Sequence, residues 1–310
     1  MRRTRPLMVV LFALFALMAS SCGDSGEGPG AAPAGGDDTR TVQHAMGSTE
    51  ITGEPQRVVV LDTGELDSVL ALGVTPVGAV RADATSGLQS YLADRAQDVT
   101  MVGTVTQPNL EAIAALQPDL ILSSKLRHES LYDEFSKIAP TVFAETVGVA
   151  WKENFLLAGE ALGKREEAER ILADYKQKAE QVGQQFGDPN TLAVSMLRFT
   201  PTNIRLYGEG SFIGTILSDA GFARPQSQQV DKTVIEISRE QLSLADGDLL
   251  FYSSYGETQQ DQLTAGPLWQ SLGAVSRGRA HEVPDDVWYL GIGPIAANLV
   301  LDDLKGFAAS

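Results

Sequence analysis

Cationic, hydroxyl and aromatic side chains gather just beyond the predicted strands of this sequence, or on the strand beside them. Strands are predicted at Pro76–Val80, Leu120–Leu122, Thr191–Met196, Ile204–Tyr207, Leu249–Tyr252 and His281–Val283. The side chains that follow these strands or lie on one of them are Arg81, Lys125, Arg127, Arg198, Arg205, Tyr207, Ser254, Tyr255 and Trp288. Because ligands of α/β sheets bind beyond the carboxyl ends of the strands, this shared placement makes the set a candidate ligand site.

The chemistry of this set favours a bulky anionic ligand. Its five Arg and Lys side chains can hold oxyanions by forked or point-charge contacts. Tyr and Trp add flat apolar surface that suits an aromatic or bulky organic group. A single Arg or Lys is more often a solvated surface charge, so the common placement carries the prediction.

Patterns for enzymatic or metal chemistry are missing from the sequence. The three histidines, His44, His128 and His281, are scattered and are expected in an entry hairpin, a loop and a strand edge. No His-x-x-x-His pair, glycine-rich phosphate loop or G-x-S-x-G elbow occurs. We therefore expect no enzyme, no cofactor and no metal ligated directly by the protein.

Two halves of alternating strands and helices must position the candidate site. The half at 41–150 has predicted helices at Glu65–Leu72, from Asn109 and at Glu129–Ile138, and the half at 188–310 has them at Ser211–Ala220, Ser238–Ala245, Asp261–Leu272 and Gly293–Phe307. Pro267 should break the third of these into two pieces. Short apolar strands that alternate with helices predict an α/β fold with mostly parallel sheets.

A long amphipathic helix is predicted at Arg165–Phe186, within a helical segment at 151–187. Its apolar positions recur with a 3.6-residue period, and Gly187-Asp188-Pro189 ends it. Two readings stay open on pattern alone: a surface helix of a single domain, or a bridge between the two halves. Trp151, just before it, could face a ligand or the core, and the core is the expectation.

An internal echo favours the bridge. NLEAIAALQPDL, which starts at Asn109, aligns with SREQLSLADGDL, which starts at Ser238. Glu111 and Glu240 occupy the same place in the two copies, 240 − 111 = 129 residues apart. Duplicated architecture on both sides of one long helix accounts for this better than coincidence.

The N-terminus reads as a targeting segment. Arg2, Arg3 and Arg5 precede an apolar run at Leu7–Ala19, which predicts a signal peptide at 1–21. Cys22 is the only cysteine and follows small residues, as in a bacterial lipobox, although Ala19 stands where leucine is usual. We expect a lipid on Cys22, a Gly-, Ala- and Pro-rich tether at 22–40, and no membrane-spanning helix.

Net charge restricts the partners. The formal charge is −16, and removing three basic residues with the signal peptide leaves 21 − 40 = −19. A surface this acidic excludes nucleic acid as a general partner. Cations that gather in one place are then local exceptions, which strengthens the case for an anion site.

Several segments together resemble the ferric-siderophore substrate-binding lipoproteins of bacterial ABC importers, a family that includes cobalamin- and haem-binding relatives. They are PQRVVVLD, LEAIAALQPDLIL, SSKLRHESLYDEFSKIAPTVF, MLRFTPTNIRLYGEGSFIGTIL, ISREQLSLADGDLLF and the DDVWYLGIGP region. The resemblance implies two Rossmann-like lobes joined by one long helix, as in class III periplasmic binding proteins, with the ligand between them and little hinge motion. It also implies that Glu111 and Glu240 dock onto a permease. The alternative is that both only complement helix dipoles.

The expected protein is thus an exported, lipid-anchored monomer on the outer face of the cell membrane. It would bind a ferric siderophore, which itself holds the iron, and would deliver it to an ABC transporter permease. A cobalamin or haem receptor of the same fold is one alternative. A cell-envelope protein without a transport role is the other.

Overall fold

The computed structural model describes residues 39–82, 87–256 and 258–308. The chain from Asp37 to Ser310 forms one compact unit. The predicted signal peptide, nearly all of the predicted tether and the predicted lipid site at Cys22 lie outside the described residues. Strand β1 (Thr39–His44) begins two residues before the predicted end of the tether and pairs with β2 (Gly47–Thr52).

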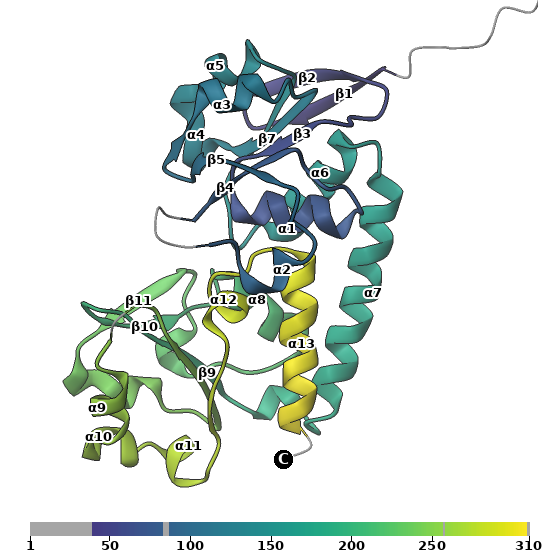
Figure 1. Cartoon of the computed structure of the whole chain (residues 1–310). Coiled ribbons are helices and arrows are strands. Elements are labelled where there is room, and N and C mark those ends of the chain that lie inside the picture. The colour runs from purple at the N-terminus through teal and green to yellow at the C-terminus, as the bar shows by residue number, and fades with distance from the viewer. Residues whose placement is uncertain (1–38, 83–86, 257, 309–310) are drawn as a thin grey trace, which may run out of the picture. The chain divides into compact units, whose positions relative to one another are not determined.

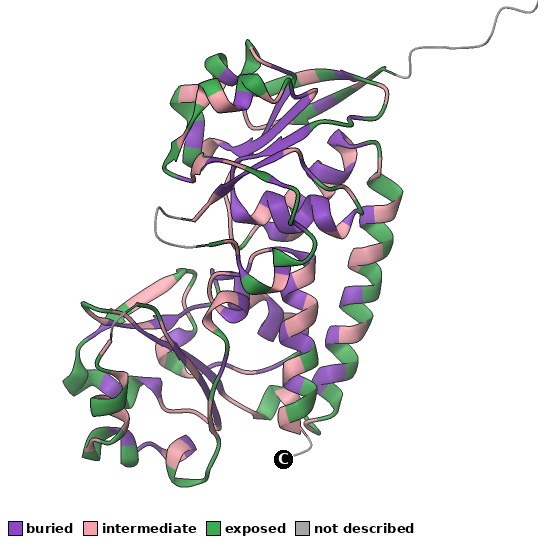
Figure 2. Cartoon of the chain, viewed as in Figure 1, coloured by how far each residue is buried: buried purple, intermediate pink, exposed green. Residues whose placement is uncertain are grey.

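The N-terminal sheet has the strand order β6-β5-β4-β3-β7-β8 (Figure 1). Its strands are β3 (Val58–Val60), β4 (Gly78–Arg81), β5 (Thr100–Thr104), β6 (Gln107–Pro108), β7 (Leu120–Ser124) and β8 (Thr141–Ala144). All neighbours are parallel except β5 and β6. Most of the strands are buried (Figure 2), as parallel strands covered on both faces should be.

Helices cover both faces of this sheet. They are α1 (Thr63–Ala71), α2 (Ser90–Ala93), α3 (Leu110–Ala115), α4 (Lys125–His128), η1 (Glu129–Leu131), α5 (Tyr132–Ser136) and α6 (Trp151–Ala161). Val58 and Val60 of β3 pack into the cluster that contains α1 and α6. Val59 packs into the opposite cluster, with Ile113 of α3 and Phe135 of α5. Because successive side chains of this apolar strand point to opposite faces of the sheet, they pack into a separate core on each face.

The C-terminal sheet has the order β11-β10-β9-β12-β13 and mixes strand directions. Its strands are β9 (Val194–Phe199), β10 (Ile204–Tyr207), β11 (Val234–Ile237), β12 (Leu249–Ser254) and β13 (Ala280–Glu282). Strand β10 is antiparallel to both of its neighbours, so β11, β9, β12 and β13 all run in one direction. Four strands thus end at the same edge of the sheet.

Helices and short 3₁₀ turns complete the C-terminal lobe. They are η2 (Pro189–Thr191), α8 (Phe212–Asp219), η3 (Gln226–Gln228), η4 (Arg239–Ala245), α9 (Gln260–Thr264), α10 (Pro267–Gln270), α11 (Gly273–Ser276), α12 (Asp285–Trp288) and α13 (Pro294–Ala308). The predicted helix at Asp261–Leu272 does break at Pro267, into α9 and α10. Proline has no amide hydrogen to continue a helix, but it suits the first turn of a new one.

The long helix α7 (Arg165–Gln184) packs against both lobes. Ala168 joins the N-terminal core, whereas Tyr175, Ala179 and Val182 join the C-terminal one. Leu172 packs against both. The prediction of a bridge is confirmed, because α7, about 30 Å long, runs along both lobes (Figure 1) and its apolar side chains pack into both cores.

Arg40 joins strand β1 to the end of helix α6 and to Gly53 by hydrogen bonds. Its Nε donates to the carbonyl of Glu160 at 2.9 Å, and its two terminal nitrogens donate to the carbonyls of Ala161 and Gly53 at 2.6 Å each. Two of these carbonyls belong to the last turn of α6, which an arginine suits because helix carbonyls there lack intrahelical partners.

Several predicted elements need correction. The predicted helix Glu129–Ile138 is divided among η1 and α5, and Ser238–Ala245 is a 3₁₀ helix. Arg81 is the last residue of β4 and does not follow the strand. Helix α6 fills the first part of the helical segment predicted at 151–187. Strand β11 was not expected, because it is a half-exposed edge strand that lacks a buried apolar run.

Gly183 sets the distance between α7 and α8. A Cβ at this position would overlap the backbone carbonyl oxygen of Ala220, which closes α8. We expect Gly183→Ala to lower the free energy of unfolding by about 1–3 kcal/mol through overpacking, measured by denaturant titration. Gly306→Ala in α13 is the matched control, because a Cβ there meets nothing within 4 Å. Equal losses in the two variants would contradict the close approach of α7 and α8.

Candidate functional site

The candidate site occupies the edges where the parallel strands of each sheet end. In the N-terminal lobe this edge carries Arg81 of β4, Asp62 after β3, Lys125 and Arg127 after β7, and Glu145 after β8. The C-terminal edge carries Ser254, Tyr255 and Asp285, with Arg198 next to the last residue of β9. Each lobe therefore collects cations, carboxylates or hydroxyls at its strand ends.

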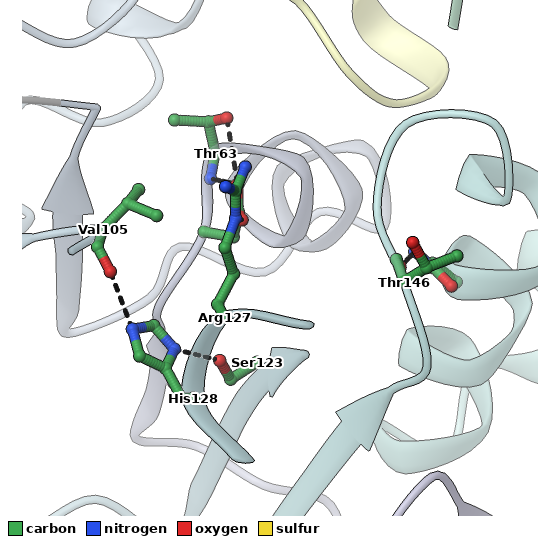
Figure 3. A network of polar contacts seen from close by, with 8 residues as sticks. Thr63, Val105, Ser123, Arg127, His128 and Thr146 are labelled. Atoms are coloured by element: carbon green, nitrogen blue, oxygen red, sulfur yellow. Dashed lines mark hydrogen bonds and ion pairs between the residues drawn. The ribbon is translucent and has the colours of Figure 1, made fainter. Parts of the chain in front are cut away.

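Arg127 is held by the buried N-cap of α1. Its Nε donates to Oδ2 of Asp62 at 2.7 Å, and the Asp62 side chain is 1% exposed (Figure 3). Oδ1 of Asp62 accepts from the backbone amide of Thr63, the first residue of α1, at 2.7 Å, and so satisfies one of the unpaired amides of the helix start. The Arg127 side chain stays 37% exposed, so its remaining donors can meet a ligand.

His128 anchors the short helix that carries Arg127. Its Nε2 lies 2.7 Å from the carbonyl oxygen of Val105, which can only accept, so Nε2 carries the proton (Figure 3). Nδ1 then accepts from the hydroxyl of Ser123 at 2.7 Å. Burial lowers the pKa of His128, which keeps the ring neutral. The prediction that His128 is a loop residue was wrong, since it is buried and supports α4.

Arg198 is the most enclosed cation of the site. Its side chain is 5% exposed, and both Nε, at 2.7 Å, and a terminal nitrogen donate to the carboxylate of Asp285. Oδ1 of Asp285 also accepts from Ser253 at 2.6 Å. The guanidinium carbon lies 4.5 Å from the ring centroid of Tyr255. Burial opposes its charge, yet the hydrogen bonds of Asp285 and Tyr207 leave the pKa of Arg198 raised.

Four of the five predicted cations have carboxylate partners. Besides the two pairs above, Lys125 lies 3.3 Å from Glu145 and Arg205 lies 3.4 Å from Glu236. Arg81 makes no ion pair with any residue that the structure describes, and it is half-buried. Carboxylates therefore balance four of the five predicted cations.

Two predicted aromatic contacts are core residues. Trp288 is fully buried, stacks on Phe251 at 4.9 Å and donates from Nε1 to Asp303 at 2.8 Å. Tyr207 is 6% exposed and packs against Tyr289 at 4.9 Å. Neither side chain offers a surface to a ligand, because Trp288 of α12 and Tyr207 of β10 both point into the core.

Tyr255 follows β12 as predicted, whereas Ser254 is the last residue of the strand and does not follow it. Tyr255 is 38% exposed, one of the few large apolar side chains that reach the surface. The hydroxyl of Ser254 contacts Gln260 and accepts from Thr258 at 3.3 Å. Trp151, by contrast, is a core residue, 1% exposed, whose Nε1 donates to Thr215 of α8 at 2.9 Å.

The site residues that sequence reasoning missed are mainly the carboxylates. Asp62 ends the PQRVVVLD segment and Asp285 begins DDVWYL, so both lay in segments that were already singled out. Their N-cap and first-turn positions beside a strand end were a usable signal. Tyr289 was also missed, and its hydroxyl lies 2.9 Å from the carbonyl of Leu197 and 3.0 Å from that of Phe251.

Glu111 and Glu240 are exposed and both lie in a first helical turn. Asn109 caps α3, with its Oδ1 accepting from the amide of Ala112 at 3.0 Å. Ser238 and Gln241 form a capping box at η4, and a hydrogen bond from Ser238 lowers the pKa of Glu240. A hollow of about 500 Å³ lies beside Glu240 and is lined also by the turn at 200–203.

Contacts between the lobes surround the site. Asp67 of α1 is fully buried and accepts from the amides of Ile295 and Ala296, at 2.8 and 3.0 Å, in the first turn of α13. In the reverse direction, Asp286 of α12 accepts from the amide of Ser90 at 2.9 Å and from its hydroxyl. Each lobe thus supplies a carboxylate to the first turn of a helix in the other.

Two buried acids have strongly raised pKa values. Burial and the charge of Asp62 raise the pKa of Glu65 to about 8, and Oε2 of Glu65 has no hydrogen-bond partner. Burial raises the pKa of Asp67 to about 7, against the stabilising amides of α13. Both groups were absent from the predicted site, because nothing in a helical pattern tells an inward carboxylate from an exposed one.

Within residues 39–82, 87–256 and 258–308, no three His, Cys, Asp or Glu side chains lie close enough together to hold a metal ion. No described helix combines the length and the apolar character that crossing a bilayer requires.

The fold and the strand-end site define a two-lobed solute-binding protein, and the chain belongs to the periplasmic binding protein family, whose model matches residues 58–287. The probable siderophore-binding lipoprotein YfiY of Bacillus subtilis (strain 168) is 38% identical over 315 residues, which cover 97% of each chain. The Fe(3+)-citrate-binding protein YfmC of the same strain is 32% identical over 286 residues, covering 91% of this chain and 90% of that one.

A solved structure is also similar. Staphylococcus aureus SirA complexed with staphyloferrin B aligns with a TM-score of 0.79 and 35% identity, covering 86% of this chain and 98% of that one. The family resemblance drawn from the sequence is confirmed, as is the α/β fold of two lobes joined by a long helix.

The raised pKa values predict a loss of stability as the pH rises from about 5 to about 8. In this window the folded chain keeps protons on Glu65 and Asp67 that the unfolded chain has released, so higher pH favours unfolding. Glu65→Gln mimics the protonated form and should flatten the fall in the thermal midpoint. Glu180→Gln, on the exposed side of α7, is the control. Identical pH profiles for the parent chain and Glu65→Gln would contradict a buried, protonated Glu65.

Proposed function

We propose that this chain is a receptor for a ferric siderophore and delivers it to an ABC importer. The observation that carries the proposal is the gathering of cations at the strand ends of both lobes in an acidic chain. Its similarity to a probable siderophore-binding lipoprotein and to an Fe(3+)-citrate-binding protein, over nearly the full length of each, supports the same class of ligand. Iron is then cargo that the siderophore ligates, and the protein binds without catalysing a reaction.

The ligand of this proposal lies between the two strand-end edges. Arg81 and the exposed donors of Arg127 neutralise its charge from the N-terminal lobe. Tyr255 offers a flat surface from the C-terminal lobe, with Arg198 directly beside its ring. Because most cations are already paired, the ligand must bring several oxyanion groups and an extended shape to bind tightly.

Export, anchoring and delivery complete the proposal. Cys22 carries the lipid that holds the protein at the outer face of the cell membrane. Glu111 and Glu240, both exposed, dock the two lobes onto basic side chains of the permease. The receptor acts as a monomer, with one ligand and one permease complex.

Calorimetric titration tests the ligand class. We expect saturable binding of at least one ferric hydroxamate, catecholate or carboxylate chelate. Arg81→Ala should raise its Kd about tenfold or more, since a charged hydrogen bond contributes about 1.5–3 kcal/mol. Arg170→Ala, on the exposed face of α7, removes the same charge away from the strand ends and should leave Kd unchanged. Binding of cobalamin or haem alone would overturn the siderophore assignment.

Delivery is tested by removing both candidate docking carboxylates. Glu111→Ala combined with Glu240→Ala should abolish uptake of the ferric complex by cells while leaving its Kd intact, because Arg127 and Arg198 pair with other carboxylates, Asp62 and Asp285. Glu166→Ala with Glu180→Ala, both on the exposed face of α7, removes the same charge as a control. Normal uptake by the Glu111 and Glu240 variant would rule out docking through these residues.

A further inference from the structure

Asp285 occupies the place on Arg198 where an external oxyanion would bind. The two side chains meet in a fork, with Nε and one terminal nitrogen of Arg198 donating to the two oxygens of Asp285. A carboxylate of a ligand takes the same bidentate geometry on a guanidinium. Asp285 is 18% exposed and Arg198 only 5%, so the carboxylate lies on the solvent side of the pair.

Other approaches to Arg198 are largely closed. The ring of Tyr255 lies 4.5 Å from the guanidinium carbon and that of Tyr289 lies 5.8 Å from it. The second terminal nitrogen faces the hydroxyl of Tyr207 at 3.4 Å. A guanidinium binds oxyanions in its plane, and the forked edge of that plane belongs to Asp285.

The carboxylate can leave without unfolding its surroundings. Asp285 is the first residue of α12, while Trp288 at the other end is fixed by Asp303 and by full burial. Besides its fork with Arg198, the Asp285 side chain accepts a hydrogen bond from the hydroxyl of Ser253. A change of rotamer at Asp285 would therefore free the fork and leave the helix in place.

We propose that Asp285 is a specificity-determining residue: it occupies the anion position on Arg198 in the unliganded receptor, and an oxyanion of the ligand replaces it on binding. This inference rests on the proposed function. The carboxylate of Asp285 is held by three hydrogen bonds. The binding free energy that a small anion obtains from Arg198 alone is too small to displace it. A large polyanionic chelate that also contacts Arg81 and Arg127 gains enough, so Asp285 rejects small free anions.

Asp285→Asn tests the inference, with two probes measured by calorimetry. The ferric chelate that the parent chain binds should bind at least tenfold more tightly, and citrate without iron should change from no measurable binding to saturable binding. Asp174→Asn removes an exposed carboxylate from α7, away from Arg198, and should produce neither gain. Ser253→Ala removes one hydrogen bond of Asp285 and leaves the pair with Arg198 in place. It should lower the Kd of both probes by a smaller factor.

The outcomes separate this inference from the proposed function. Weaker or unchanged binding of both probes by a folded Asp285→Asn protein, with no gain in Ser253→Ala, overturns the role of Asp285. If the parent chain binds no ferric chelate, the proposed function fails. The citrate probe still decides whether Asp285 excludes small anions from Arg198.

Discussion

Two carboxylates exchanged between the lobes constrain the rest of the molecule. Asp67 reaches from α1 into the first turn of α13, and Asp286 reaches back from α12 to Ser90. The first turn of a helix has unpaired backbone amides. A helix start that is buried against another lobe therefore needs a hydrogen-bond acceptor from that lobe. Gly293 leaves room for this contact, because a Cβ there would lie 2.5 Å from Oδ1 of Asp67. The relation of the two strand-end edges depends on these bonds and on α7.

Charge balance at the strand ends gives the site its character. Arg198, the buried cation of the candidate site, is paired with the carboxylate of Asp285. An unpaired charge taken out of water would cost on the order of several kcal/mol. The receptor therefore folds without a ligand and has little free positive charge to attract anions indiscriminately. Arg81 and the exposed part of Arg127 are the cations that remain available among the described strand-end residues. Selectivity then depends on how many of these positions one molecule reaches at once.

Much of the fold could be predicted from local pattern. The continuous apolar run before Asp62, the 3.6-residue stripe of α7 and the repeated NLE and SRE segments each led to the correct architecture. The counter-ions could not be predicted in the same way, because they come from distant parts of the chain. Arg127 pairs across 65 residues and Arg198 across 87. Trp288 was predicted to face a ligand but is buried, for a related reason. A position after a strand does not determine which way a helical side chain points.

The hydrogen bonds of Arg40 affect how the fold bears a mechanical load. Three hydrogen bonds from one guanidinium join the first described strand to the end of α6 and to Gly53. Tension applied to the chain before Thr39 would first load this guanidinium and the β1–β2 ladder, both in the N-terminal lobe. The strand-end edges and the exchanged carboxylates lie elsewhere in the fold. A chain pulled from its N-terminal side can thus bear the force without distorting the two strand-end edges.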